Sequence, residues 1–337
     1  RFANGLTVKL QLNTIMKKNP LRIILFLFML SACATYKSNQ TIEEESPLKD
    51  INKETTNVFL IGDAGKPQDD GSIPKALSVL QEQFSKADKN DLLLFLGDNI
   101  YPKGIPSKEE HGTKKAKKAL KQQLEVAKTF PGNVYFIPGN HDWYSGLKGL
   151  KRQEKMGEDD LGKNTFLPEN GCPIEKININ DDTVLIVVDS QWYITNWNKH
   201  PTINDNCEIK TRTDFLNEFR GEIKKARGKT TLVAVHHPML TNGKHGGNYS
   251  FAEHMMPVPI FGTFKNIIRT TSGLVNADIY NQFYNEFRKN LIAVAQQNEN
   301  VIFLSGHDHS LQYIENDNIA QIISGSGSKT TPVNVKK

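Results

Sequence analysis

Five short polar motifs each follow an apolar run that has the composition of a β-strand. Carboxylate and phenolate oxygens favour a harder metal ion, whereas imidazole and neutral amide groups favour a softer one. The motifs supply all four kinds of group, as a pair of unlike metal ions would require. They are Asp63-Ala64-Gly65, Gly97-Asp98-Asn99-Ile100-Tyr101, Gly139-Asn140-His141-Asp142, His236-His237-Pro238 and Gly306-His307-Asp308-His309. We therefore expect a metal-dependent hydrolytic site.

Each motif taken alone also has a structural interpretation. An aspartate after a strand can cap a helix, and Asn140 can occupy a turn. Tyr101 can be a packed ring, since Pro102 follows it directly. The two imidazoles of His307 and His309 are harder to explain structurally, because alternate residues can both address one site. The joint occurrence of all five motifs favours metal binding.

The elements that must position these motifs alternate between strand and helix patterns. The expected strands are Val58–Ile61, Leu92–Leu96, Val134–Ile137, Thr183–Val188, Thr231–Val235, Val301–Leu304 and Ile319–Ile323. The expected helices are Pro74–Ala87, Thr113–Phe130, Thr213–Ala226 and Ile279–Asn298. This alternation predicts an α/β fold with largely parallel strands. In such a fold the loops that leave the carboxyl ends of the strands meet at one edge, and all five motifs lie in such loops.

Two stretches show little periodicity and are expected to be surface excursions. These are residues 143–180 and residues 239–278, both rich in Gly, Asn and Pro. The second follows the His236 motif, and a loop of this length often acts as a lid. His245 and His254 within it are candidates for substrate contacts, although loop histidines more often have surface or packing roles, as we expect for His111. The role of His237 is open, and we expect Asp189 to be structural.

The first 56 residues have the features of an export and anchoring segment. A basic stretch at Met16, the apolar run Leu21–Leu30 and the small residues before Cys33 form the layout of a secretory signal. The apolar run is too short for a permanent membrane span. Residues 30–33 resemble a bacterial lipobox, whose cysteine carries the lipid, although a plain signal peptide with an incidental cysteine is the alternative.

We accordingly expect four parts. They are residues 1–15 as upstream or non-native sequence, residues 16–32 as signal peptide, residues 33–56 as the lipidated Cys33 with a flexible tether, and residues 57–337 as the folded domain with the five motifs, with C-terminal truncation left open. The protein would then be a lipid-anchored membrane protein of the bacterial cell envelope, facing the periplasm or the exterior. Cys172 and Cys207 could form a disulfide in that compartment, but the sequence leaves their pairing undecided.

The net charge of +5 arises in the N-terminal segment. Residues 1–32 hold five of the 42 basic residues and no acid, so 37 basic residues remain against 37 acidic ones. A chain without a net positive field offers no general attraction for nucleic acid, and we expect no nucleic-acid partner.

The motif set resembles the calcineurin-like metallophosphoesterase superfamily over roughly residues 57–330. Within it, the chain is most similar to the purple acid phosphatases, especially the tartrate-resistant type, and this part of the resemblance rests mainly on Tyr101. The resemblance implies a β-sandwich of mixed sheets flanked by helices, with a dimetal site at the carboxyl ends of the strands. Ala64 departs from the pattern, since many purple acid phosphatases have tryptophan there.

The resemblance also implies roles for individual residues. It implies three ligands of Fe³⁺, three ligands of a divalent ion (Fe²⁺, Zn²⁺ or Mn²⁺) and one carboxylate that bridges the two ions. In that order they are Asp63, Tyr101 and His309; Asn140, His236 and His307; and Asp98. His141 is implied to contact the phosphate and to help protonate the leaving group while a metal-bound hydroxide attacks. Asp98 and His141 are thus the expected catalytic residues.

The expected function is hydrolysis of phosphate monoesters, with a phosphorylated small molecule or a phosphoprotein as substrate. A phosphodiesterase, pyrophosphatase or nucleotide hydrolase would use the same centre, because the walls of the pocket decide between these substrates. A calcineurin-like enzyme with two divalent ions and a non-coordinating Tyr101 is a further alternative. A non-catalytic binding module of the envelope is disfavoured by the complete set of ligands.

Overall fold

The computed structural model describes residues 55–333, except residues 69, 71, 108–111, 201 and 317 and the side chain of residue 199. The chain divides into two units, Arg1–Glu54 and Thr55–Lys337, and the account below concerns the second. The signal peptide, Cys33 and most of the tether predicted from the sequence, together with His111, lie outside the described residues. No helix in the described part is long and apolar enough to cross a membrane.

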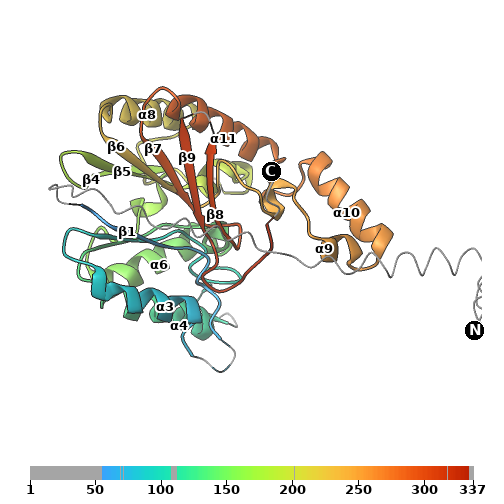
Figure 1. The fold of residues 1–337 in the computed structure, drawn as a ribbon, viewed down its shortest axis with the longest axis horizontal. Helices are drawn as coiled ribbons and strands as arrows, with labels where there is room; N and C mark the ends of the chain where they lie inside the picture. The colour runs from blue at the N-terminus through green and yellow to red at the C-terminus, as the bar shows by residue number, and fades with distance from the viewer. Residues whose placement is uncertain are drawn as a thin grey trace, which may run out of the picture. The chain divides into compact units, whose positions relative to one another are not determined.

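Two β-sheets form the centre of the domain (Figure 1). The smaller sheet is parallel, in the order β1-β2-β3, and comprises β1 (Val58–Ile61), β2 (Leu92–Phe95) and β3 (Asn133–Phe136). The larger has the order β4-β5-β6-β7-β9-β8 and comprises β4 (Ile174–Asn178), β5 (Thr183–Val188), β6 (Thr230–Val235), β7 (Val301–Ser305), β8 (Leu311–Asn316) and β9 (Ile319–Ser324). Its inner strands are parallel, whereas the edge strands β4 and β8 are antiparallel to their neighbours.

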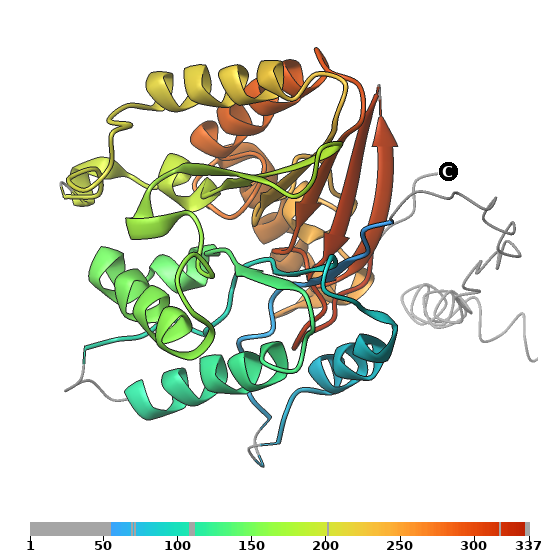
Figure 2. The same ribbon diagram turned by 90° about the vertical axis from the view of Figure 1, so that its left-hand side faces the viewer.

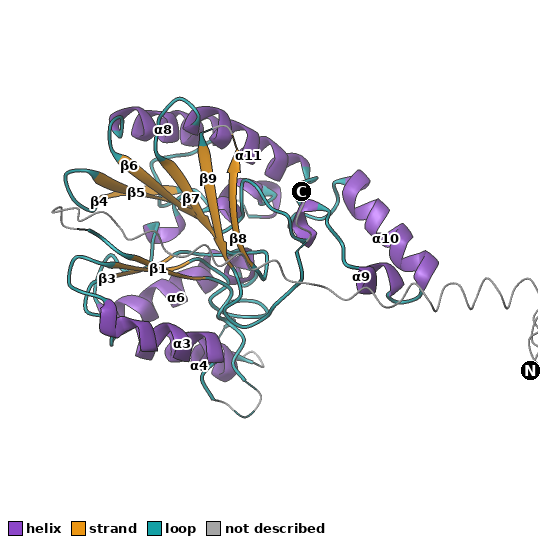
Figure 3. Cartoon of the chain, viewed as in Figure 1, coloured by secondary structure: helices purple, strands orange, loops and turns teal. Residues whose placement is uncertain are grey.

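The sheets face each other across an apolar layer, and helices cover their outer faces (Figures 2 and 3). Leu94 of β2, Leu185 of β5 and Ala234 of β6 belong to one fully buried cluster, which joins the two sheets into a sandwich. The smaller sheet is covered by α3 (Lys75–Gln83), α4 (Thr113–Ala127) and α6 (Gly146–Leu161), and the larger by α8 (Arg212–Lys225) and α11 (Gln282–Ala295).

The remaining helices are short or lie apart from the sheets. They are α5 (Asn140–Trp143), α7 (Ser190–Ile194), α9 (Phe251–Met255), α10 (Pro259–Ser272) and the 3-10 helices η1 (Phe84–Lys86), η2 (Glu169–Gly171), η3 (Trp197–Lys199) and η4 (Lys244–Gly246). Helices α9 and α10 project from the body of the domain (Figure 1). They expose large apolar side chains, including Phe251, Ile260 and Phe264.

Local signals in the sequence explain where the covering helices begin. At α8, the hydroxyl of Thr211 accepts from the backbone N–H of Asp214, whose carboxylate accepts from the N–H of Thr211 in return. This reciprocal pair satisfies backbone donors that the first turn leaves free. At α11, the side chain of Asn281 accepts from the backbone N–H groups of Phe283 and Tyr284. Both helices then bury one apolar face, including Phe219 and Phe287.

The expected strands and long helices are observed within a few residues of their predicted bounds, and the α/β sandwich is confirmed. The prediction that residues 143–180 form an irregular excursion was wrong, because this stretch contains α6 and β4. The buried face of α6 consists mainly of Gly149, Gln153, Glu154 and Gly157, with Leu150 as its apolar member. A buried face made of glycine and polar residues shows no hydrophobic periodicity, so the helix is hidden in the sequence.

The strands are largely parallel, as expected, and the larger sheet is mixed because its edge strands are antiparallel. Edge strands β4 and β8 were not predicted, because their residues are at best half-buried and lack a continuous apolar run. Residues 239–278 do leave the sheets, as expected, but they form η4, α9 and α10. Cys172 and Cys207 form a disulfide with their Cα atoms 5.4 Å apart, which settles the pairing that the sequence left open.

Candidate metal centre

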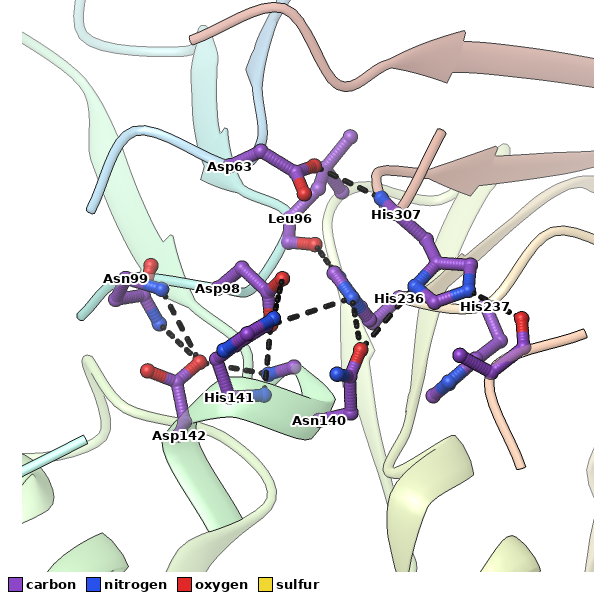
Figure 4. A network of polar contacts seen from close by, with 12 residues as sticks. Asp63, Leu96, Asp98, Asn99, Asn140, His141, Asp142, His236, His237 and His307 are labelled. Carbon is purple, nitrogen blue, oxygen red and sulfur yellow. Dashed lines mark hydrogen bonds and ion pairs between the residues drawn. The ribbon is translucent and has the colours of Figure 1, made fainter. Parts of the chain in front are cut away.

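The five motif loops converge at the carboxyl ends of the strands, as the sequence predicted (Figure 4). Asp63 follows β1, Asp98 follows β2 and His236 follows β6, and each of these three buried residues offers a ligand atom within 4.8 Å of the others. Residues more than 170 positions apart in the chain therefore face one point. This arrangement is what a parallel sheet produces at its carboxyl edge.

Three of the converging residues have left-handed backbone conformations. The φ angles are 59° at Asp63, 53° at Asp98 and 71° at His307. Residues other than glycine rarely adopt this backbone conformation, so the surrounding structure must hold these three residues in it. Hydrogen bonds between the loops do so, since Asp63 N donates to Gly97 O at 2.9 Å and Gly65 N donates to Asp98 O at 3.1 Å. The sharp turns direct the side chains back over the ends of the strands.

Glycines beside the converging residues allow the loops to approach. A Cβ atom at Gly139 would lie 2.3 Å from Asp98 Oδ1, and one at Gly97 would lie 2.6 Å from His236 Nδ1. A Cβ at Gly306 would lie 2.6 Å from Asp63 Oδ2. These distances are far inside normal contact, so only glycine permits this packing. The glycines of the motifs are therefore part of the site.

One group of donors consists of Asp63, Tyr101 and His309. The hydroxyl of Tyr101 lies 2.8 Å from Asp63 Oδ1 and 3.1 Å from His309 Nε2, and the latter atom is 3.4 Å from Asp63 Oδ1. Burial and the neighbouring carboxylate of Asp63 raise the pKa of Tyr101 well above its ordinary value. Without a cation the phenol is neutral, and a hard trivalent ion among these three atoms would favour the phenolate.

The second group consists of Asn140, His236 and His307. Asn140 Oδ1 lies 3.1 Å from His236 Nε2 and 3.1 Å from His307 Nδ1. The opposite ring nitrogens meet backbone carbonyls, with His236 Nδ1 2.8 Å from Leu96 O and His307 Nε2 2.7 Å from Ala277 O. Those outer nitrogens must carry the protons, because a carbonyl only accepts.

The tautomers set by Leu96 and Ala277 have an electrostatic consequence. When both imidazoles are neutral, the inner nitrogens of His236 and His307 are acceptors, and they face a third acceptor, the amide oxygen of Asn140. Burial is the main cause that lowers the pKa of His307 well below its ordinary value, so protonation does not relieve the repulsion there. Three acceptors that face one another without a hydrogen between them suit a bound cation, and the outer carbonyls orient the rings for it.

Asp98 lies between the two groups. Its Oδ1 accepts from the backbone N–H of His141 at 2.9 Å and lies 3.4 Å from His236 Nε2. Burial acts to raise the pKa of Asp98, but His236, His141 and this N–H outweigh it and lower the pKa. Asp63 shows the opposite result, since burial and the charge of Asp98 raise its pKa to about 7. Two buried carboxylates that repel each other in this way form a site that cations stabilise.

His141 is positioned beside this centre rather than within it. Its side chain is 28% exposed, and its Nδ1 lies 2.7 Å from the carbonyl of Pro102, which accepts the proton of that nitrogen. Its Nε2 is therefore free to exchange a proton and lies 3.9 Å from Asp98 Oδ2. The ring packs edge-on against Tyr101 at 4.4 Å between centroids. These contacts hold a proton-transfer group at the mouth of the site.

Two aspartates support the site, and sequence reasoning assigned no role to either. Asp142 is fully buried and accepts backbone N–H groups from Gly139 at 2.7 Å, Asn99 at 3.1 Å and Ile100 at 3.1 Å. It thereby joins the loop after β2 to the loop after β3. Asp308 accepts from the hydroxyl of Thr241 and from a backbone N–H, and so anchors the loop after β6. The sequence signal that could have identified both aspartates is their position inside two of the five motifs.

The remaining histidines do not face the metal centre as substrate contacts. His237 is buried, with Nδ1 2.7 Å from the hydroxyl of Ser190. His245 is buried behind His307, at 4.1 Å between ring centroids, and its Nδ1 lies 2.8 Å from Asp278 Oδ1. His254 contacts Thr263 within the projecting hairpin. His245 thus has a packing role next to His307, which is the more usual role of a loop histidine, and does not have the alternative role of a substrate contact.

Asp189 has the structural position expected from the sequence. One carboxylate oxygen accepts from Trp192 N at 3.0 Å and caps α7, and the other accepts from Trp143 Nε1 at 2.7 Å. Burial raises the pKa of Asp189 to about 7, although these donors oppose the shift. The contacts join α5, which carries Asn140, to the end of β5.

Comparisons with known proteins agree with this architecture. The family model described as Calcineurin-like phosphoesterase matches residues 56–311. Purple acid phosphatase 3 of Arabidopsis thaliana is 22% identical over 329 residues, which cover 93% of this chain and 74% of that protein. Tartrate-resistant acid phosphatase type 5 of Homo sapiens is 20% identical over 249 residues, which cover 72% of this chain and 62% of that protein.

A solved structure described as GAP50, the anchor in the inner membrane complex of Plasmodium, aligns with a TM-score of 0.48 at 14% identity, covering 83% of this chain and 75% of that one. The family model matches most of this chain, and its match begins before β1 and ends at the start of β8. The chain therefore belongs to the calcineurin-like phosphoesterase family, a family of dimetal-dependent hydrolases.

Proposed function

We propose that this protein hydrolyses phosphate monoesters at a centre of two metal ions, one ferric and one divalent. The observation that carries the proposal is the convergence of buried ligand atoms, in which the inner nitrogens of His236 and His307 each lie 3.1 Å from the amide oxygen of Asn140. The names of two similar proteins, which are acid phosphatases, support the choice of a monoester.

The donor types suggest how the residues divide between the ions. The phenol, carboxylate and imidazole of Tyr101, Asp63 and His309 suit the ferric ion, and the amide and two imidazoles suit the divalent ion. Asp98 has contacts with both groups and would bridge the ions. When bound, the ions would neutralise phosphate charge and lower the pKa of a water molecule.

The protein's own groups then carry the remaining chemistry. In the reaction the oxygen of water bonds to phosphorus, and the ester P–O bond breaks with its electron pair on the alkoxide. One proton of that water ends on the alkoxide, which leaves as an alcohol. His141 is placed to hand over this proton through Nε2, because Pro102 O keeps Nδ1 protonated. A positioned acid of this kind is typically worth about 10²–10⁴-fold in rate.

Metal analysis and turnover on one sample test the proposal. We expect purified protein prepared in air to contain two metal ions per chain, to be violet and to hydrolyse p-nitrophenyl phosphate. Two ions and turnover without colour would favour a pair of divalent ions and a non-coordinating Tyr101. A folded protein that binds no metal and hydrolyses no phosphate ester would refute the proposal and favour a non-catalytic binding module.

Replacing Tyr101 with phenylalanine is expected to abolish the violet colour, because the absorption would arise from charge transfer between the phenolate and the ferric ion. The change should also loosen the ferric ion, since the ion loses a hard phenolate donor. A visible spectrum with metal analysis checks both effects. Tyr313 lies on β8 and is exposed, so Tyr313→Phe is the matched control that should keep the colour. A persistent violet band in Tyr101→Phe would exclude Tyr101 as a ligand.

We further propose that Cys33 anchors the protein in the bacterial cell envelope through a lipid. The proposal rests on the basic residues, the apolar run Leu21–Leu30 and the small residues that precede Cys33. Cys33→Ser is expected to move the protein from the membrane fraction to the soluble fraction, because a lipid chain supplies the anchor. Fractionation of cells that express either form checks this, and continued membrane association of the variant would point to another anchor.

A further inference from the structure

Three lysines gather at the Tyr101–His309 side of the metal centre. They come from three separate loops, with Lys66 after β1, Lys244 in η4 after β6 and Lys329 after β9. Their elements are distant in the sequence, so the tertiary structure alone brings these charges together. None of the three has a role in the chemistry proposed above.

The segment that carries Lys329 is held firmly across the motif loops. Gly325 N donates to Ser310 O at 3.1 Å, Gly327 N donates to Gly62 O at 3.0 Å and Thr331 N donates to His309 O at 2.7 Å. A Cβ at Gly327 would lie 2.4 Å from Gly62 O, so this approach requires glycine. The segment places the ammonium of Lys329 3.2 Å from the centre of the Tyr101 ring.

The other two lysines are positioned next to the same segment and the same histidine. Lys66 N donates to Ser328 Oγ at 3.3 Å, which places Lys66 beside the residue before Lys329. Lys244 lies between Gly243 and His245, whose backbone contacts Asp308: a Cβ at Gly243 would lie 2.5 Å from the Asp308 carboxylate. Because Asp308 precedes His309, this anchor brings Lys244 to the ferric side of the centre.

The charges act on one another at this position. Lys244 and Lys329 both lie within electrostatic range of His309. Lys244 and Lys66 act on Lys329 as like charges, whereas Asp98 and Asp63 act on it as opposite charges. The ammonium of Lys329 is therefore repelled by those of Lys66 and Lys244, and an anion among them would relieve this repulsion.

Among the described residues, no carboxylate outside the metal centre forms an ion pair with this group. The lysines that form ion pairs within the described part of the chain are Lys128, Lys155, Lys176 and Lys225. The acids that act on Lys329 are Asp98 and Asp63, which would be committed to metal ions. Among the described residues, the three ammonium groups thus remain without an ion-pair partner of their own.

We propose that Lys66, Lys244 and Lys329 form a subsite for a second phosphate group on the substrate, beside the scissile phosphate at the metal centre. This inference rests on the proposed function. Two metal ions and His141 suffice for the scissile phosphate, so three further cations exceed what a simple monoester needs. Lysine binds phosphate as a point charge on a flexible stem and suits a second group whose position varies with the substrate.

Calorimetric titration of the metal-loaded protein tests the subsite without relying on turnover. The probes are methylphosphonate, methylenediphosphonate and propane-1,3-diphosphonate, which carry one phosphonate, two adjacent ones and two separated ones. We expect at least one diphosphonate to bind about tenfold more tightly than methylphosphonate, the effect of one or two partly exposed charge contacts. Tighter binding of the methylene compound would indicate a phosphoanhydride substrate, and tighter binding of the propane compound a bisphosphorylated alcohol.

The variant Lys66→Gln/Lys244→Gln separates the lysines from the metal ions as the source of this preference. We expect the diphosphonate preference to fall to about twofold or less in this variant. Lys224→Gln is the matched control, because Lys224 is exposed on α8 at the outer face of the larger sheet. A preference that survives in the double variant would overturn the inference, as would equal binding of all three probes by the unchanged protein.

Failure of the subsite and failure of the proposed function give different results. Turnover of p-nitrophenyl phosphate with no diphosphonate preference would refute the subsite and leave the phosphatase intact. A lysine-dependent diphosphonate preference without turnover of any ester would retain the subsite and refute the hydrolase. Metal content measured on each variant shows that binding is compared at equal loading.

Discussion

Asp98→Asn is expected to lower kcat by more than about a thousandfold, above the usual effect of removing one electrostatic donor. Asp98 contacts both groups of candidate ligands, since its Oδ1 lies 3.4 Å from His236 Nε2 and its carboxylate accepts a hydrogen bond from the side chain of Tyr101. An amide keeps the shape of the side chain but loses the charge that would hold two cations close together. Both ions should therefore bind more weakly, and we expect less than two metal ions per chain.

Steady-state hydrolysis of p-nitrophenyl phosphate and metal analysis check this prediction. Asp181→Asn provides the matched control, because Asp181 is exposed in the turn between β4 and β5, at the end of the sheet opposite the motif loops. It should retain full metal content and turnover. An Asp98→Asn protein with two metal ions and unchanged kcat would remove Asp98 from the centre.

Asp142→Ala is expected to reduce the free energy of unfolding by about 3 kcal/mol and to lower activity by about 10–100-fold. The carboxylate accepts three buried N–H groups, of which Gly139 and Ile100 represent the two loops that it joins. Alanine would leave these donors without an acceptor and release the loop of Asn140 from the loop of Asp98. Asn at this position keeps one oxygen acceptor and should give an intermediate result.

Urea unfolding and metal affinity, measured on the same variants, distinguish positioning from simple destabilisation. Asp91 is an equally buried aspartate that accepts from Asn57 N at 2.7 Å and from Asp88 N at 3.0 Å. It lies at the start of β2, away from the metal centre. Asp91→Ala should lose comparable stability but keep its metal affinity. Equal loss of metal affinity in both variants would show that Asp142 acts only through stability.

The strained turns at the site suggest why it tolerates little change. Asp63, Asp98 and His307 have φ angles in the left-handed region, which most side chains avoid. Each is held by a loop that contacts a glycine from another motif. The sheet edge, the glycines and the aspartates such as Asp142 therefore form one connected support. These supporting contacts explain why each candidate ligand lies within a short block of motif residues.

Much of the site could be predicted from the sequence because the candidate ligands lie close in sequence to the strands that position them. Each candidate ligand directly follows an apolar strand, and strands of a parallel sheet share one carboxyl edge. Asp63 and Asn140 end strands of the smaller sheet and could be expected together, whereas their meeting with His307 of the larger sheet depends on how the two sheets pack. The donor types then indicate the chemistry, since oxygen and nitrogen ligands favour different metal ions. The long strands and helices were predictable for the same reason, through their continuous or periodic apolar residues.

Other features depend on contacts between distant residues, and only the tertiary structure decided them. The buried face of α6 is made mainly of glycine and polar residues, and the residues of edge strands β4 and β8 are half-buried or exposed, so all three elements lack a clear hydrophobic signal. The disulfide required Cys172 and Cys207 to meet across 35 residues. Which nitrogen of His307 carries the proton depends on Ala277 O. Lys66 and Lys329 come together because Lys66 N bonds to Ser328, 262 positions along the chain. Such contacts arise from packing, which the residue types of one segment do not encode.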